Sequence, residues 1–348
     1  MKYPLKPPIK PMLSKLEREI PHGDGWLYEP KWDGFRAIVF RSGDDLRVDS
    51  RNGQPLLRYF PELTKIASES FPDRCVLDGE IVIPSERGLD FDALQLRLHP
   101  AESRVRKLMD EIPAAFVPFD LLAIGDDDLR GRPFAERRAR LVDVIRVTER
   151  CFPTPQTDDG TVAEGWFERF EGAGLDGIVA KRPDQRYVEG KREMVKIKHE
   201  RTADCVVGGY RLNKERDGIG SLLLGVYDDE GTFHFLGFTS SFKAAERREM
   251  LALLEPMRTG DSFDGFRMPG ESSRWSAGKD ASWFPIEQRL VCEVAFDHLQ
   301  GGWRFRHGTT FRRWRTDKDP RDCTFDQFEE PPPFALGDIR SLSVSSSS

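Results

Sequence analysis

The first 200 residues alternate between short apolar runs and amphipathic stretches, a pattern that predicts β-strands interleaved with α-helices. The predicted strands lie in residues 28–41, where an Asp-Gly turn separates two of them, and in residues 75–84, 115–124, 174–182 and 193–201. The predicted helices lie in residues 59–70, 91–98, 134–147 and 162–172. No strict βαβ rhythm and no G-x-G-x-x-G loop accompany these elements, so a Rossmann domain is not supported.

The last of these helices has a recognisable start signal. Thr161 precedes it and Glu164 follows three residues later, which is the spacing of a capping box. We therefore expect Thr161 to cap this helix.

The pattern changes after about residue 200, where five short apolar runs and one helix follow in about 120 residues. The strands are predicted in residues 203–212, 221–228, 233–240, 288–299 and 303–314, and the helix in residues 243–254. This element set is typical of a five-stranded OB-fold barrel. We therefore predict an α+β protein in which antiparallel sheets with flanking helices are followed by an OB-fold β-barrel.

Domain limits follow from the same pattern. Residues 1–25 are rich in Pro and Lys and predict an extended arm, residues 26–200 the first domain, and residues 201–325 the barrel. Residues 326–348 become Pro-rich and then Ser-rich, which predicts a disordered tail.

Composition supports a cytoplasmic, reduced protein of ordinary globular character. The chain has 348 residues, of which 38% are hydrophobic and 32% charged, enough for two cores. No apolar run is long enough to span a membrane, and Lys and Pro occupy the start where a signal peptide needs apolar residues. The five cysteines include no Cys-x-x-Cys pair, which argues against a disulfide framework and a zinc ribbon.

The net charge of −6 disfavours a nucleic-acid partner at first sight, but binding depends on local charge. Residues 303–318 contain five Arg and one Lys against one Asp, with four aromatic residues interleaved. This composition suits a nucleic-acid surface. It equally suits a solvated strand whose Arg stems pack on aromatic rings, and the stretch alone does not separate the two.

The most informative short segment is Lys31-Trp-Asp-Gly-Phe-Arg36. A lysine at a strand end before an Asp-Gly turn exposes its amine at the mouth of a cleft, and Arg36 can reach the same ligand. Lysine acts as a covalent nucleophile when desolvation or neighbouring positive charge deprotonates it. Taken alone, the segment is more often a hairpin with two solvated charges.

Further segments follow Lys31 in a defined order. They are Ser50-Arg-Asn-Gly53, Leu77-Asp-Gly-Glu80, Phe116-Val-Pro-Phe-Asp120, Asp176-Gly-Ile-Val-Ala-Lys181, Val195-Lys-Ile-Lys198 and Arg315-Thr-Asp-Lys318. Each segment alone is more often a turn or a buried strand. As an ordered set, from about residue 28 to residue 318, they resemble the motifs of covalent nucleotidyltransferases, which include DNA ligases, RNA ligases and mRNA capping enzymes. The layout is most similar to bacterial ATP-dependent DNA ligases of the ligase C type.

The resemblance implies that the first domain is a nucleotidyltransferase, or adenylation, domain and that Lys31 is its nucleophile. Lys31 would attack the α-phosphorus of ATP, expel pyrophosphate and carry AMP as a phosphoramidate. Lys196 and Lys198 alternate on one face of a strand. Both would neutralise the α-phosphate and, by like-charge repulsion, favour the neutral form of the Lys31 amine.

Three carboxylates are implied as ligands for Mg²⁺ or Mn²⁺, namely Glu80, Asp176 and Asp33. Hard oxygen ligands and phosphates suit Mg²⁺, which few protein groups usually hold. Glu80 would hold either the ribose or the metal. Asp176 stands where the family usually has Glu, so its metal contact could pass through a water molecule.

The remaining implied site residues bind nucleotide. Arg36 and Arg51 would hydrogen-bond the sugar and later the 5′-phosphate of a nick, a task that suits guanidinium groups. Phe119 would stack on adenine, while Glu29 and Lys181 complete the nucleotide contacts. Arg315 and Lys318, together with Asp317, would close over ATP from the barrel domain, orient pyrophosphate, and then move away so that DNA can bind.

The sequence therefore predicts an ATP-dependent DNA ligase that seals nicks with 5′-phosphate and 3′-hydroxyl ends in DNA repair. The alternatives are an RNA ligase or capping-type guanylyltransferase, and a nucleic-acid-binding barrel protein without activity. The expected partner is nicked double-stranded DNA, with repair proteins possible and no membrane. We expect a monomer that is cytoplasmic and associated with the nucleoid.

Overall fold

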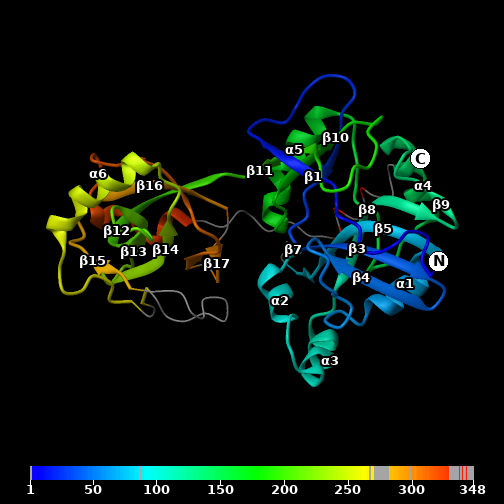
Figure 1. Cartoon of the computed structure of the whole chain (residues 1–348), viewed down its shortest axis with the longest axis horizontal. Coiled ribbons are helices and arrows are strands. Elements are labelled where there is room, and N and C mark those ends of the chain that lie inside the picture. Colours follow the sequence, from blue (N-terminus) through cyan, green and yellow to red (C-terminus); the bar gives the residue numbers. More distant parts are fainter. Residues whose placement is uncertain are drawn as a thin grey trace. The chain divides into compact units, whose positions relative to one another are not determined.

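The computed structural model describes residues 2–86, 88–265, 268–269, 282–297, 299–301 and 303–328, together with Gly337, Ile339 and Leu342. The chain divides into two compact units, shown in Figure 1. The first unit comprises Met1–His199 and Pro331–Ser348, and the second comprises Glu200–Glu330. The division after His199 lies one residue from the limit expected from the sequence.

A five-stranded antiparallel sheet forms one half of the first unit. Its strand order is β4-β3-β5-β8-β9, and its strands are β3 (Phe35–Ser42), β4 (Asp45–Ser50), β5 (Arg74–Val82), β8 (Ala115–Ile124) and β9 (Asp127–Asp128). The register of β3 against β5 sets Arg36 opposite Glu80. This pairing brings two of the predicted site residues together although 44 positions separate them.

A second, four-stranded sheet has the order β1-β11-β10-β2. Its strands are β1 (Leu13–Glu17), β2 (Leu27–Pro30), β10 (Gly177–Lys181) and β11 (Arg192–Lys198). Strands β2 and β11 both pair with β10 in antiparallel fashion, which places Val179 between Glu29 and Lys196. The two sheets therefore contain the strands that carry the predicted motifs of the first unit.

The N-terminal segment differs from the extended arm expected from its Pro-rich sequence. Strand β1 pairs in parallel with β11, and Leu5, Ile9 and Met12 are buried. These three side chains pack in a cluster that includes Ile38 of β3. The proline content keeps this segment non-helical, but its apolar residues make it part of the domain core.

Helices flank the sheets as predicted, with one addition. They are α1 (Leu63–Ser70), α2 (Phe91–Leu96), α3 (Glu102–Glu111), α4 (Phe134–Val144) and α5 (Gly160–Phe170). Helix α3 was not predicted, because it buries only Val105 and Leu108 and so shows no full apolar stripe. The minor elements are β6 (Pro84–Ser85), β7 (Gly88–Leu89) and η1 (Glu171–Ala173).

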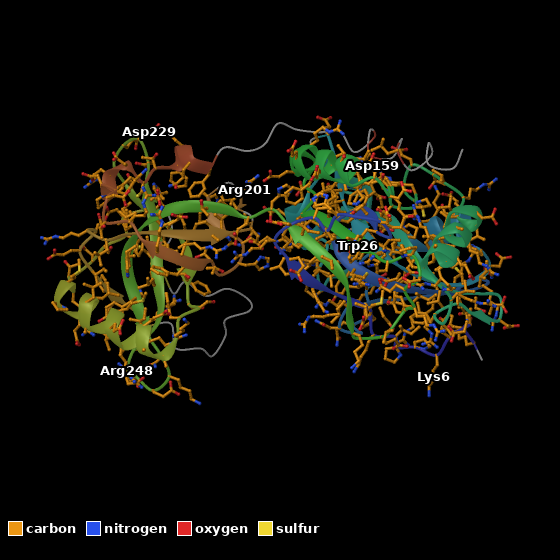
Figure 2. All side chains as sticks on the ribbon, turned by 90° about the horizontal axis from the view of Figure 1, so that it is seen from above. Lys6, Trp26, Asp159, Arg201, Asp229 and Arg248 are labelled. Carbon is orange, nitrogen blue, oxygen red and sulfur yellow. The ribbon has the colours of Figure 1, made fainter. Side chains whose placement is uncertain are left out.

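The start of α5 corrects the capping prediction. The N-cap is Asp159, labelled in Figure 2, and its side chain accepts hydrogen bonds from the backbone N–H groups of Thr161 and Val162. The expected cap, Thr161, lies inside the first turn. Aspartate accepts from the first backbone amides as well as threonine does and carries a charge that favours a helix N-terminus.

The second unit is built on one six-stranded antiparallel sheet, in which five strands have the order β14-β13-β12-β16-β19 and the sixth, β15, pairs with β12. Helix α6 contacts β13 of this sheet. These elements are β12 (Arg201–Leu212), β13 (Ile219–Tyr227), β14 (Phe233–Thr239), α6 (Ala244–Leu254), β16 (Val291–Phe296) and β19 (Thr310–Trp314). Short additional elements are η2 (Glu255–Met257), β15 (Phe284–Pro285), β17 (Leu299–Gln300), β18 (Arg304–Phe305), η3 (Pro320–Asp322) and η4 (Phe325–Phe328). The predicted strand in residues 303–314 is therefore two strands, β18 and β19.

The sheet of the second unit is not a closed barrel. Its edge strands β14 and β19 meet at one isolated bridge between Thr239 and Thr309, with no continuous ladder between them in the described part of the chain. The OB-fold is itself a partly open barrel, so an open sheet with a single bridge between its edge strands is consistent with the predicted class.

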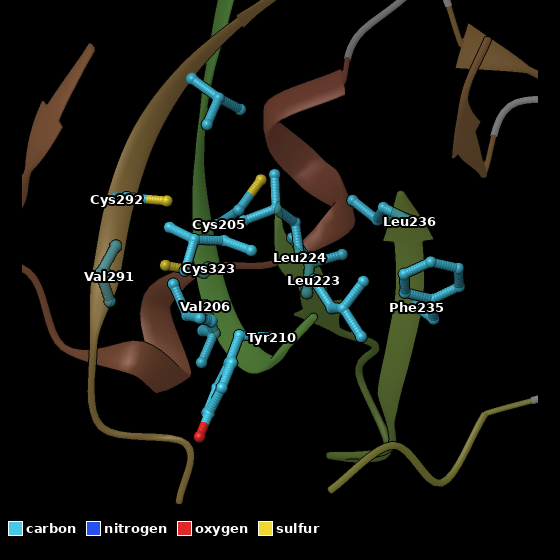
Figure 3. Close-up of a cluster of buried hydrophobic side chains, with 14 of the residues drawn as sticks. Cys205, Val206, Tyr210, Leu223, Leu224, Phe235, Leu236, Val291, Cys292 and Cys323 are labelled. Carbon is cyan, nitrogen blue, oxygen red and sulfur yellow. The ribbon is translucent and has the colours of Figure 1, made fainter. Parts of the chain in front are cut away.

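Cysteines contribute to the cores as apolar side chains. Figure 3 shows Cys205, Cys292 and Cys323 among the apolar residues of the second unit. All five cysteines of the chain are buried and free of disulfide bonds. This agrees with the interpretation drawn from their scattered positions.

The C-terminal segment returns to the first unit. Of the residues expected to be disordered, Ile339 is fully buried and Leu342 packs beside it in a cluster with Ile20, Tyr28 and Trp32. Residues 325–328 form η4 rather than the start of a disordered tail. The Pro- and Ser-rich composition hid two apolar positions that find partners far away in the sequence. No helix among the described residues is long and apolar enough to cross a membrane.

Candidate active site in the first unit

The site is organised around Lys31, which follows β2 directly. The Lys31 N–H donates to the carbonyl of Gly177 at 2.8 Å, and the Asp176 N–H donates to the carbonyl of Lys31 at 2.9 Å. These two backbone hydrogen bonds fix Lys31 beside the start of β10. The side chain that precedes the Asp-Gly turn is therefore held by a second motif 145 residues away.

The Lys31 amine is paired with a buried carboxylate. Its Nζ lies 2.5 Å from Oδ2 of Asp176, and Nζ of Lys198 lies 2.8 Å from the same oxygen. The Asp176 side chain is 4% exposed, whereas the Lys31 side chain is 20% exposed. One buried carboxylate thus holds two amines in place, and the side chains of Lys31 and Lys198 remain partly exposed to solvent.

Lys196 adds a third amine to this cluster. Burial lowers the pKa of the Lys196 amine, and the positive charges of Lys31 and Lys198 lower it further. Arg51 acts in the same direction, while Asp176 opposes the change. Lys31, Arg51, Lys196 and Lys198 therefore lie close enough together to interact electrostatically. Arg51 itself is exposed, in the turn after β4.

Glu80 lies on β5 and is partly buried. Burial raises the pKa of its carboxyl from 4.5 to about 8, and the negative charges of Asp33 and Asp78 contribute to the increase. Lys31 and Arg36 oppose it. A carboxyl group that ionises reluctantly beside other carboxylates is a place where a bound cation would be favourable.

The carboxylates of Glu80 and Asp33 interact electrostatically and are the two that could contribute to a divalent cation site. Within the described residues, no group of three or more His, Cys, Asp or Glu side chains could hold a metal ion. Mg²⁺ is commonly bound by one or two carboxylates together with phosphate oxygens of the substrate. Glu80 and Asp33 could supply the two carboxylates. The third predicted metal ligand, Asp176, accepts hydrogen bonds from Lys31 and Lys198 through Oδ2.

Because the pKa of Glu80 is raised, the free energy of unfolding should depend on pH. Between pH 4.5 and about 8 the folded protein keeps a proton on Glu80 that the unfolded chain gives up. The free energy of unfolding should therefore fall as pH rises through this range, by up to about 1.4 kcal/mol per pH unit from this group. We expect Glu80→Gln to remove that contribution, so that the variant gains stability relative to the parent between pH 5 and pH 8.

Urea unfolding of nucleotide-free protein across pH 5–8 measures this difference. Glu102→Gln is the matched control, because this carboxylate on α3 is 78% exposed. The prediction would be contradicted if the difference in free energy of unfolding between the parent and Glu80→Gln stayed constant from pH 5 to pH 8.

Arg36 is held by a residue to which the sequence gave no role. Its Nε and Nη2 donate to the two oxygens of Asp78 at 3.0 and 2.7 Å. Asp78 is fully buried and also accepts a hydrogen bond from the hydroxyl of Tyr187 at 2.7 Å. Asp78 lies in a predicted motif, but nothing in the sequence links Tyr187 to it.

A second network surrounds Phe119. The Lys181 ammonium pairs with Glu29 at 2.6 Å, and both side chains are about 3% exposed. Lys181 also lies 5.0 Å from the centroid of the Phe119 ring, and the Arg36 guanidinium lies 5.3 Å from it. Phe119 is the partly exposed position within a run of buried residues on β8. Gln156, which the sequence did not indicate, donates to Glu29 at 2.9 Å.

Arg315 and Lys318 belong to the second unit. Nη1 of Arg315 donates to both carboxylate oxygens of Asp204, at 2.9 and 2.7 Å, and Nη2 pairs with Asp317 at 2.8 Å. Hydrogen bonds from Arg315 lower the pKa of Asp317 to about 2. Lys318 lies 3.8 Å from Asp204. The structure groups these three motif residues with one another.

The basic stretch at residues 303–318 is less positive than its composition suggests. Arg313 pairs with Glu293 at 2.8 Å, Arg312 pairs with Glu200, and Arg315 is paired as described. Phe311 and Trp314 pack against the core of the unit. Part of this stretch therefore follows the alternative interpretation of a strand whose arginines are neutralised within the domain.

Comparisons with known proteins identify related sequences along most of the chain. The model of the ATP dependent DNA ligase domain matches residues 9–198, and that of the ATP dependent DNA ligase C terminal region matches residues 215–318. DNA ligase C of Mycobacterium tuberculosis is 50% identical over 358 residues, covering 97% of this chain and 99% of that protein. DNA ligase C2 of Mycolicibacterium smegmatis is 50% identical over 349 residues, covering 95% and 97% respectively.

A solved structure of a Lig E DNA ligase has the same general fold. It matches with a TM-score of 0.55 at 17% identity and covers 87% of this chain and 99% of that chain. At this identity the similarity concerns the fold.

Proposed function

Because the chain belongs to the ATP-dependent DNA ligases, we propose that Lys31 carries AMP from ATP to the 5′-phosphate of a DNA nick. The activity of the family is the ATP-dependent joining of DNA strands. Relatives that are DNA ligases at 50% identity favour this activity over RNA ligation or guanylyl transfer. We propose below which residues of this chain carry out each step of the reaction.

The observation that carries the proposal is the cluster formed by Lys31, Asp176, Lys196 and Lys198. Asp176 holds Lys31 and Lys198 on one oxygen, and burial together with the charges of these two amines lowers the pKa of Lys196. Lys31 would attack the α-phosphorus of ATP, forming an N–P bond as pyrophosphate leaves. Lys196 and Lys198 would neutralise the α-phosphate, because charge stabilisation and positioning supply most of the rate in such reactions.

The nucleotide would lie against the Phe119 network. We propose that adenine stacks on Phe119, that Glu29 and Lys181 border the base, and that Arg36 and Arg51 contact the sugar and later the nick phosphate. Phe119 is partly exposed while its neighbours on β8 are buried, which supports a stacking role over a purely structural one. For Arg315 and Lys318 we retain the predicted role of binding the pyrophosphate leaving group.

Mg²⁺ or Mn²⁺ would be held by Glu80 and Asp33 together with phosphate oxygens of ATP. When bound, the cation would supply additional neutralisation of phosphate charge. Its presence would also remove the cost of ionising Glu80, whose carboxyl has a pKa of about 8 without it. Asp176 would contribute mainly by orienting Lys31 and Lys198.

The DNA substrate we propose is a nicked duplex with 5′-phosphate and 3′-hydroxyl ends. Each of the three steps, from ATP to lysine, from lysine to 5′-phosphate and from phosphate to 3′-hydroxyl, is a phosphoryl transfer. One chain contains the residues proposed for all three steps, so we expect a monomer to be active. We further propose that it works in DNA repair at the nucleoid with repair proteins as partners, since nicked DNA arises there.

Intact-protein mass spectrometry tests the proposal. Nucleotide-free protein incubated with ATP and Mg²⁺ should gain the mass of one AMP, and subsequent addition of nicked duplex should return the original mass. A nick without a 5′-phosphate is the matched control and should leave the AMP on the protein. Labelling by GTP in place of ATP, or retention of AMP in the presence of the phosphorylated nick, would refute the ligase mechanism proposed here.

A further inference from the structure

We propose that Tyr187 is a positioning residue, which links the N-terminal segment to Arg36 through Asp78 and fixes the guanidinium in its binding orientation. The inference rests on the proposed function, because it takes Arg36 to be a nucleotide-binding residue. Its evidence is a buried chain of hydrogen bonds that runs from Met12 through Tyr187 and Asp78 to Arg36.

The direction of each hydrogen bond in this chain is determined. The backbone N–H of Met12 can act only as a donor, and it lies 3.1 Å from the hydroxyl oxygen of Tyr187. The oxygen of Tyr187 is therefore an acceptor toward Met12. Its single hydrogen is left to point at Oδ2 of Asp78, 2.7 Å away. The N-terminal segment thus orients the Tyr187 hydroxyl, which donates a hydrogen bond to Asp78.

Asp78 connects this series of hydrogen bonds to Arg36 of the proposed active site. The residue is fully buried, and Oδ2 accepts from Tyr187 and from Nη2 of Arg36, while Oδ1 accepts from Nε of Arg36. The bidentate contact defines the plane of the guanidinium and directs Nη1 away from Asp78. Because Tyr187 donates to Oδ2, it holds the carboxylate in the orientation that this contact requires.

The loop that carries Tyr187 is itself fastened on several sides. The Tyr187 N–H donates to the carbonyl of Arg130 at 2.9 Å, and the sulfur of Met12 accepts from Val188 N–H at 3.4 Å and from Gln185 at 3.5 Å. The ring of Tyr187 lies 5.8 Å from the guanidinium of Arg137. With its backbone and ring held in this way, the hydroxyl has a fixed position from which to act on Asp78.

Loss of the hydroxyl should loosen Arg36 without removing it. In a Tyr187→Phe variant, Asp78 loses one of its donors and the guanidinium loses part of its constraint, while the ring and its packing remain. Arg36 is proposed to contact the nucleotide sugar before and during adenylylation alike, so its loosening should weaken ATP binding more than it slows the chemical step. The expected signature is a rise in half-saturating ATP with little change in the maximal rate.

Single-turnover adenylylation with labelled ATP and Mg²⁺ measures both quantities on the full-length protein. We expect Tyr187→Phe to raise half-saturating ATP on the order of 10-fold, with a maximal rate within about twofold of the parent. The matched control is Tyr28→Phe, which removes a hydroxyl that donates to the carbonyl of Pro21 at 2.6 Å in the same unit. Tyr28 is as well buried as Tyr187, so a general loss of packing or stability would affect both variants equally.

A double-mutant comparison decides whether Tyr187 acts through Arg36. In an Arg36→Ala background, adding Tyr187→Phe should produce no further rise in half-saturating ATP. An additional 10-fold effect in that background, or a Tyr187→Phe protein with the ATP dependence of the parent, would overturn the inference. If Tyr187→Phe does not fold, Asp78→Asn preserves the shape of the side chain and must raise half-saturating ATP in the same way.

The outcomes separate this inference from the proposed function. A parent protein that takes no label from ATP contradicts the proposed function, and the positioning role falls with it. A parent that is labelled normally, with Tyr187→Phe equal to Tyr28→Phe, leaves the proposed function intact and refutes the positioning role alone.

Discussion

Replacement of Lys31 by arginine is expected to abolish covalent adenylylation, with a fall in rate of at least about 10⁴-fold. The guanidinium keeps the positive charge that Asp176 binds at 2.5 Å, so the fold of the site should be preserved. Arginine does not lose its proton under physiological conditions and therefore offers no lone pair to attack the α-phosphorus. Intact mass after incubation with ATP and Mg²⁺ measures the result directly.

The exposed lysine at position 65 supplies the control for this experiment. Its side chain on α1 is 78% exposed, and Lys65→Arg should accept AMP as the parent does. Nicked-DNA binding should also survive in Lys31→Arg and in Lys31→Ala, because neither change removes another cation of the cluster. Measurable transfer of AMP to the Lys31→Arg protein would assign the nucleophile to a different residue.

Gly177→Ala should have the second largest effect, on stability and on the site together. Gly177 has φ +127°, which an L-residue with a side chain rarely adopts, and an added Cβ would lie 2.0 Å from the carbonyl oxygen of Ile197. We expect a loss of about 3 kcal/mol in the free energy of unfolding, since neither the strain nor the contact with the backbone can be relieved locally. Adenylylation should fall on the order of 100-fold, because moving β10 from β11 separates Asp176 from Lys198.

Urea unfolding and single-turnover adenylylation test both parts of this prediction. Gly131→Ala is the matched control in the same unit, because no atom lies within 4 Å of the position that its Cβ would occupy. That variant should stay within about 0.5 kcal/mol of the parent. Normal stability in Gly177→Ala would mean that β10 and β11 can shift apart at little cost, contrary to the geometry described here.

The segments around Lys31, Lys196 and Lys198 are short local motifs that the sequence displays by itself. The roles predicted for these lysines depend on the ordered set of motifs and on the family that the set resembles, because each motif alone is more often a turn or an edge strand. The structure brings all three together with Asp176, and the pairing of β3 with β5 does the same for Arg36 and Glu80. Strand periodicity and turn residues are local signals, so the strands and most helices could also be predicted.

The parts that could not be predicted depend on contacts between distant segments. Tyr187 meets Asp78 across 109 residues, and Gln156 meets Glu29 across 127 residues, with no periodicity to indicate either pair. The N-terminal segment reads as an extended arm because its prolines dominate the local pattern. Its buried side chains are explained only by the sheet against which they pack. Closure of the second sheet likewise depends on how β14 and β19 approach each other, which strand patterns do not specify.

The burial of Ile339 has a consequence for synthesis of the protein on the ribosome. Ile339 completes a core whose other members include Ile20, Tyr28 and Trp32 near the start of the chain. Domains generally fold in the order in which they emerge, but this one lacks a core residue until residue 339 has been made. The second unit, Glu200–Glu330, is translated in between and can fold first. The core of the first unit is therefore completed only after the whole of the second unit has been translated.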